Sequence, residues 1–86
     1  MSQLARIAAL IPVEYRREIL ELNIIDNAQA VAGNKDMFYL TTVWTNYIEP
    51  GFSPDCNLCY GRVLKNFRAI KPLLVELEKN ANLLKS

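Results

Sequence analysis

The sequence predicts an all-α fold: a single helical domain over residues 1–86, built as a small bundle of four to five short helices in which the last helix is long and kinked at Pro72. Two observations predict this fold class. Apolar residues recur at spacings of three and four along most of the chain, which is the spacing of one helix face. Residues that commonly start helices (Ser, Asp and Pro) precede these apolar segments.

Two helices are expected in the first part of the chain. Ser2 is an N-cap residue for a helix through Leu10, and Pro12 suits the first position of a second helix that runs to about Asn23. Within the second helix, Arg17 stands at ion-pair spacing from Glu14 and Glu21.

The apolar residues of this second helix fall on two roughly opposite stripes. One stripe contains Val13, Leu20 and Ile24, and the other contains Tyr15, Ile19 and Leu22. A small domain has one core to face. We therefore expect the stripe of Tyr15, Ile19 and Leu22 to contact a partner.

Two further helices are predicted in the middle of the chain. Asp26 is placed to cap a short helix that ends at Gly33. Residues 37–48 have the Thr, Val, Tyr and Trp content of a strand, but helical spacing gathers Met37, Leu40, Trp44 and Tyr47 into one stripe. Because Asp36 is a suitable N-cap and Pro50-Gly51 a suitable stop, we predict a helix here.

The last helix has the clearest amphipathic pattern. Its apolar stripe, which stays in phase across Pro72, contains Val63, Leu64, Phe67, Ile70, Leu74 and Leu77. The other side carries four cations, Arg62, Lys65, Arg68 and Lys71. These cations could contact the phosphates of a nucleic acid. Any solvated amphipathic helix shows the same pattern, so a solvated face or an acidic protein partner is the favoured interpretation.

A Cys-x-x-Cys motif, Cys56 and Cys59, precedes this stripe and follows a Ser-Pro-Asp helix-start signal at residues 53–55. A helix N-terminus lowers the pKa of a thiol, which suits redox chemistry or metal binding. The redox interpretation lacks the usual βαβ context. Zinc needs four ligands, so Cys56 and Cys59 could bind it only between two chains. The favoured interpretation is that one or both cysteines are small apolar residues that fill the junction between the loop and the last helix.

Composition argues against an enzyme. The chain has no histidine, which removes the commonest general base and the commonest metal ligand, and leaves Ser2, Ser53 and Ser86 without a base to activate them. We expect a non-enzymatic interaction protein that needs no cofactor and binds a protein partner, either itself or a larger assembly. Three aromatic residues outside the predicted stripes, Tyr39, Phe52 and Tyr60, are candidate contact residues.

Charge and hydropathy add two expectations. Residues 1–50 carry four basic and six acidic groups, a local charge of −2, and residues 51–86 carry six basic and three acidic groups, a local charge of +3. This asymmetry could orient like subunits head to tail. No apolar run reaches the roughly 18–20 residues of a membrane span, and the N-terminus has no signal-peptide pattern, so a cytoplasmic protein is expected.

Three short segments resemble a known group of proteins. The segments YIEP (47–50), SPDCNLC (53–59) and GRVLKNF (61–67) are similar to small uncharacterised helical proteins encoded by tailed bacteriophages and prophages of gut bacteria. This resemblance implies a phage accessory or virion-associated role, in the host cytoplasm or the virion. It carries over no functional residue.

Overall fold

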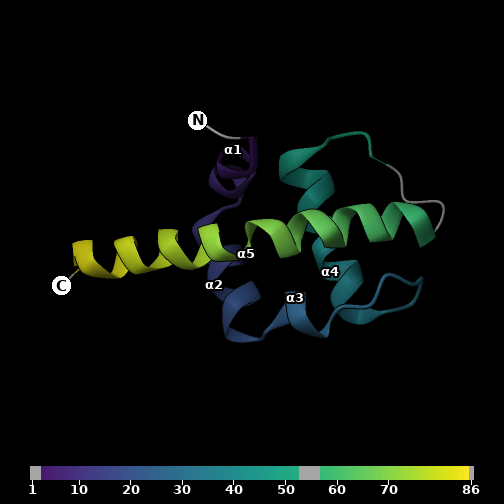
Figure 1. The fold of residues 1–86 in the computed structure, drawn as a ribbon, viewed down its shortest axis with the longest axis horizontal. Coiled ribbons are helices and arrows are strands. Elements are labelled where there is room, and N and C mark those ends of the chain that lie inside the picture. The colour runs from purple at the N-terminus through teal and green to yellow at the C-terminus, as the bar shows by residue number, and fades with distance from the viewer. Residues whose placement is uncertain (1–2, 53–56, 86) are drawn as a thin grey trace.

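The computed structural model describes residues 3–52 and 57–85, and in these residues it contains helices and loops but no strand (Figure 1). The elements are α1 (Gln3–Leu10), α2 (Val13–Glu21), α3 (Ile24–Asn27), α4 (Lys35–Val43), the π-helical turn η1 (Trp44–Ile48) and α5 (Asn57–Lys85). The predicted all-α class is confirmed. So is the helix over residues 37–48, where β propensity had favoured a strand.

The long helix α5 organises the fold, because α1, α2, α3 and α4 all pack against it. Its 29 residues, at a rise of about 1.5 Å each, give a length of about 43 Å. This length matches the longest dimension of the molecule, 43 Å. Pro72 lies inside the helix without ending it, which confirms the predicted continuity, while the bend expected there stays a prediction.

The core lies under the apolar stripe of α5. Val63, Phe67, Ile70 and Leu74 are fully buried, and the Phe67 and Trp44 rings pack in an edge-to-face arrangement with 5.9 Å between ring centroids. Leu77, the last member of the predicted stripe, is half-buried against this core. The other buried apolar side chains are Ile7, Ala8, Ile11, Ile19, Ile24, Ile25, Ala28, Met37, Leu40, Val43 and Leu64.

The two N-terminal helices meet at Pro12, which lies one residue outside α2 instead of at its first position. Pro12 takes an extended backbone, and its carbonyl accepts hydrogen bonds from the N–H groups of Tyr15 and Arg16. The helix α2 also ends two residues before Asn23. Asn23 has a φ of 52°, a left-handed conformation that asparagine tolerates and that stops a right-handed helix. Ser2, the predicted cap of α1, lies outside the described residues.

Neither predicted stripe of α2 is wholly buried or wholly exposed. Ile19 is 1% exposed within the core and Tyr15 is half-buried against it, whereas Val13 is exposed. From the same stripe as Val13, Ile24 is buried in the core and Leu20 is half-buried against it, while Leu22, from the stripe of Ile19, is exposed. The core therefore takes residues from both stripes, including Ile19, which was expected to meet a partner. Arg17 does not pair within α2; its Nε donates to the carboxylate of Glu78 in α5 at 2.5 Å, which ties the two helices together.

The short helix predicted to end at Gly33 is shorter and begins earlier. Asp26 lies inside α3 and does not cap it, and Gly33 belongs to the loop that leads into α4. Gly33 has a φ of 87°, a left-handed conformation that glycine adopts without strain, and the loop turns there just before Asn34. Asn34, not Asp36, is the N-cap: its Oδ1 accepts the Met37 N–H at 2.8 Å. Asp36 lies in the first turn of α4.

The helix α4 passes directly into η1. The N–H of Glu49 donates to the carbonyl of Trp44, five residues earlier, at 2.8 Å. Such a π-helical turn places one extra residue in the helical path and changes the direction of the side chains that follow. Trp44 remains in the core, whereas Tyr47, predicted on the same stripe, is 36% exposed.

Candidate functional site: a groove along α4

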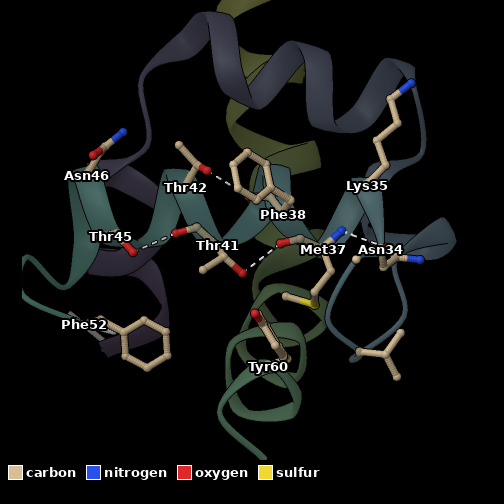
Figure 2. Close-up of a pocket in the computed structure, with 12 residues that line it drawn as sticks. Asn34, Lys35, Met37, Phe38, Thr41, Thr42, Thr45, Asn46, Phe52 and Tyr60 are labelled. Carbon is tan, nitrogen blue, oxygen red and sulfur yellow. Dashed lines mark hydrogen bonds between the residues drawn. The ribbon is translucent and has the colours of Figure 1, made fainter. Parts of the chain in front are cut away.

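A groove of about 600 Å³ lies along the outer side of α4. The loop before α4 borders one end, and Phe52 and Tyr60 border the side nearest the start of α5 (Figure 2). We call this cavity the α4 groove. Its lining residues are Val31, Gly33, Asn34, Lys35, Met37, Phe38, Thr41, Thr42, Thr45, Asn46, Phe52 and Tyr60.

Three threonines give the floor of the α4 groove an apolar character. Each hydroxyl donates to the carbonyl four residues earlier: Thr41 to Met37 at 2.8 Å, Thr42 to Phe38 at 2.9 Å and Thr45 to Thr41 at 2.9 Å (Figure 2). Because these hydroxyl protons are satisfied within the helix, a ligand finds no hydroxyl donor there. Their methyl groups and the buried side chain of Met37 supply apolar surface.

Aromatic rings form the rim of the α4 groove. Phe38 is 73% exposed, the largest exposed fraction among the large apolar side chains of the described residues. Phe52 and Tyr60 are half-buried on the opposite rim, and the Tyr60 hydroxyl points toward α4 (Figure 2). Lys35 is the one charged residue among the described residues that line the groove. The site thus offers apolar and aromatic surface with a cation at one end.

The Phe52 rim is fixed through a chain of side chains to the core. The Arg62 guanidinium lies 5.0 Å from the centroid of the Phe52 ring, in cation–π geometry. Arg62 also donates to Glu49 at 3.1 Å, and the same carboxylate accepts the Trp44 indole N–H at 2.9 Å. The hydrogen bond from Trp44, followed by the contact with Arg62, holds the pKa of Glu49 below its usual range.

The six residues predicted as contacts do not form one surface. Phe52 and Tyr60 meet at the α4 groove. Tyr15 and Tyr39 lie in another aromatic cluster with Tyr47, with ring centroids of Tyr15 and Tyr39 6.2 Å apart and of Tyr15 and Tyr47 5.5 Å apart. Ile19 is in the core, and Leu22 is 60% exposed at the end of α2.

Tyr39 is a structural residue of this second cluster. Its hydroxyl is buried and has no hydrogen-bond partner among the described residues. Burial, followed by the nearby Glu18 carboxylate and Tyr15, raises the pKa of Tyr39 to about 12. The hydroxyl therefore stays protonated at neutral pH, and Tyr39 contributes packing and not surface chemistry.

The four cations predicted on α5 have different environments. Arg62 pairs with Glu49 at 3.1 Å, and the Lys71 ammonium pairs with Asp26 at 2.7 Å. Lys65 and Arg68 are exposed and have no ion pair among the described residues. Two of the four cations are thus engaged with acids of the same chain, which weakens the case for a continuous phosphate-binding row.

The predicted metal ligands are only partly described. Cys56 lies outside the described residues, and Cys59 is half-buried near the start of α5. Within the part of the chain that the structure describes, no group of three or more Cys, Asp or Glu side chains is arranged to hold a metal ion.

The same part of the chain contains no helix that is both long and apolar enough to cross a membrane.

No family model matches this chain, and no curated protein or solved structure is significantly similar to it. Fold alone does not define a function. The function is therefore inferred from the chemistry of the α4 groove and its rim.

Proposed function

We propose that this chain is a non-enzymatic helical assembly protein that binds a second copy of itself through the α4 groove. The observation that carries the proposal is Phe38, a large aromatic side chain that is 73% exposed beside an apolar floor and a second aromatic rim. Covering a side chain of this kind contributes about 1.5–3 kcal/mol to binding.

The dimensions of the α4 groove suit a helix of another protein. Its lining residues on α4 and η1 extend over residues 35–46, a length of about 16 Å at the rise of an α-helix. An amphipathic helix of three turns has this length and presents apolar side chains along one face, the common pattern of helix-in-groove recognition. The threonine methyls and aromatic rims match such a face better than they match a polar metabolite.

A second copy is the favoured partner because of size and charge. A domain of 86 residues has a thin core, and small domains often gain stability by oligomerisation. The acidic balance of residues 1–50 and the basic balance of residues 51–86 favour contact between the first part of one copy and the last part of another.

Analytical ultracentrifugation of the wild type and two aspartate variants tests this function. We expect the wild type to sediment above the 9.8 kDa monomer as concentration rises from micromolar to millimolar. Phe38→Asp removes the exposed ring from the groove and is expected to give the monomer. Leu22→Asp is the matched control, because Leu22 is also a large exposed apolar residue but follows the last residue of α2 and does not line the groove.

Two results would contradict the proposal. A wild type that stays monomeric over the whole concentration range would contradict the proposed self-assembly. Dissociation by Leu22→Asp with no effect of Phe38→Asp would move the interface from the α4 groove to α2. Circular dichroism and Trp44 fluorescence establish that each variant is folded.

The biological setting is proposed from the sequence resemblance. We propose that the assembly belongs to a phage particle or acts during its formation. Capsid, portal or terminase genes beside the gene for this chain would support this setting, whereas a housekeeping operon would contradict it.

A further inference from the structure

We infer that two copies of this chain pair antiparallel along α4, so that Phe38 of each copy enters the α4 groove of the other. This inference rests on the proposed self-assembly and identifies the side chain that fills the groove and the symmetry of the dimer. Phe38 is 73% exposed in its own copy. Pairing of this kind covers two such rings, one from each copy.

The residues that line the α4 groove are arranged symmetrically along the helix. The three adjacent pairs 37–38, 41–42 and 45–46 all line it, and their midpoint lies between Thr41 and Thr42. A second α4, related to the first by a two-fold axis at this midpoint, runs antiparallel and presents the same three pairs in the same order. The lining is therefore in register with itself, as an isologous interface requires.

The same symmetry places a large side chain against a small one. The two-fold axis brings Phe38 of one copy opposite Thr45 of the other. Thr45 is half-buried, and its hydroxyl donates to the carbonyl of Thr41 at 2.9 Å, which leaves its methyl group for apolar contact with the ring. Phe52 borders the groove on the Thr45 side in Figure 2. The entering ring thus meets a methyl group and a second aromatic ring.

Phe38 does not reach this position within its own copy. Seven residues separate it from Thr45, which is about 10.5 Å along the helix axis. Both residues lie on the continuous path of α4 and η1, which holds them at this distance. The exposed ring and the space beside Thr45 are therefore complementary only between two copies.

Charge favours an antiparallel pair over a parallel one. In the antiparallel pair, Lys35 of one copy lies opposite Ile48 of the other, at the C-terminal end of η1, where the helix carbonyls carry partial negative charge. The Arg62 guanidinium, which lies over the Phe52 ring near this end, is already paired with Glu49 at 3.1 Å. A parallel pair would instead bring the two Lys35 ammonium groups together.

This arrangement determines the form of the assembly. An isologous contact uses the same surface on both copies and leaves neither α4 groove free. Association therefore stops at two chains, which is twice the 9.8 kDa of the monomer.

Single cysteines placed along α4 and η1 test the position of the two-fold axis. Thr42→Cys and Asn46→Cys are introduced separately into the Cys56→Ser/Cys59→Ser chain, which has no other thiol. Both positions are exposed and line the same groove, so the two variants are matched. Across the axis, the two residues at position 42 are offset along the helix by about 1.5 Å and those at position 46 by about 13.5 Å. A disulfide requires Cα atoms within about 7 Å of each other.

At concentrations where the wild type sediments as a dimer, we expect mild oxidation to link Thr42→Cys chains and to leave Asn46→Cys chains unlinked on non-reducing gels. Adding Phe38→Asp to Thr42→Cys is expected to abolish the link. The mass of the wild type is expected to level off at two chains. Circular dichroism and Trp44 fluorescence establish that each variant is folded. If the serine background does not fold, the same substitutions in the natural chain, with disulfides mapped by mass spectrometry, make the same comparison.

The outcomes separate this inference from the proposed function. Linking through Asn46→Cys would indicate a parallel pair or another register, and linking through neither position would indicate a heterologous contact. Either result, or growth of the wild type beyond two chains, would overturn the inference, while loss of association in Phe38→Asp would still support the groove as the interface. A wild type that never associates would overturn both.

Discussion

At the scale of single residues, a few polar side chains determine where the α4 groove begins and how its rim is held. Asn34 caps α4 at one end of the groove. Glu49 joins Trp44 in the core to Arg62, which lies over the Phe52 rim. Residue type alone does not predict either role. Asp36 was the cap expected from the sequence, and no partner was expected for Glu49.

The cap of α4 can be tested by two alanine substitutions. Asn34→Ala removes the acceptor of the Met37 N–H and is expected to lower the free energy of unfolding by about 1 kcal/mol. Asp36→Ala is expected to lower the free energy of unfolding by less, because Asp36 lies in the first turn and contributes only through the helix dipole. Urea titrations followed by Trp44 fluorescence measure both values. A larger cost for Asp36→Ala would show that the sequence-predicted cap is the real one.

The Glu49 carboxylate predicts a pH dependence of stability. A carboxyl group whose pKa is lower in the folded than in the unfolded state stabilises the fold above its unfolded pKa, and this contribution is lost as the pH falls through the lowered pKa. Glu49→Gln is therefore expected to be less stable than the wild type at pH 7. The difference should shrink as the pH falls below about 4.3, the ordinary glutamate pKa, and vanish below the lowered pKa.

Urea titrations of the wild type and Glu49→Gln between pH 7 and pH 2.5 measure this difference. Glu76→Gln is the matched control, since it removes one exposed carboxylate that has no ion pair among the described residues. A Glu49→Gln difference that is constant with pH would contradict the role assigned to the carboxylate.

At the scale of elements, amphipathic spacing predicted helices better than it predicted their boundaries or their faces. The stripe of α5 from Val63 to Leu74 is buried as expected. For α2, amphipathic spacing did not separate a core face from an exposed face, because both predicted stripes contribute side chains to the core and each also has an exposed member. The η1 turn could not be predicted, since a π-helical turn leaves no distinctive residue pattern.

Pro72 gives a prediction for α5. A proline inside a helix lacks the N–H that would bond to the carbonyl four residues earlier, and it is about 3 kcal/mol less favourable than alanine there. Proline also restricts the conformations of the unfolded chain, and this restriction stabilises the folded state by up to about 1 kcal/mol. Because Pro72 is exposed, Pro72→Ala is expected to raise the free energy of unfolding by about 2 kcal/mol.

Thermal and urea unfolding of Pro72→Ala measure this change, and Ala69→Gly, at another exposed position of α5, should move stability in the opposite direction by about 1 kcal/mol. A loss of stability in Pro72→Ala would mean that the packing of α5 requires a bend at this position.

At the scale of the whole molecule, the candidate site could be predicted only in part. Phe52 and Tyr60 were selected because they lie outside the helical stripes. Phe38, which carries the proposed function, was missed because single exposed apolar residues are common at protein surfaces. Only the fold shows that Val31, Phe38, Phe52 and Tyr60, from four different segments of the chain, surround one cavity.

The inter-chain zinc alternative also belongs to this scale, because it requires two molecules. If assembly depends on the α4 groove, Cys56→Ser/Cys59→Ser is expected to assemble like the wild type, and purified protein is expected to contain no stoichiometric zinc. Elemental analysis and sedimentation with and without a chelator measure both. About one zinc per two chains, together with dissociation of the double variant, would show that a zinc bridge causes assembly and that the α4 groove does not.

The central position of α5 also determines when the protein can fold during its synthesis. The four preceding helices all pack against α5, and the ribosome makes them first. Until residues 63–74 are available, Ile7, Ile19, Met37 and Leu40 have no α5 stripe to pack against. The nascent chain therefore carries uncovered apolar segments until its last helix emerges. Complete folding of residues 3–52 is expected only after α5 has been made, and chains that stall before Phe67 are expected to be substrates for chaperones and proteases.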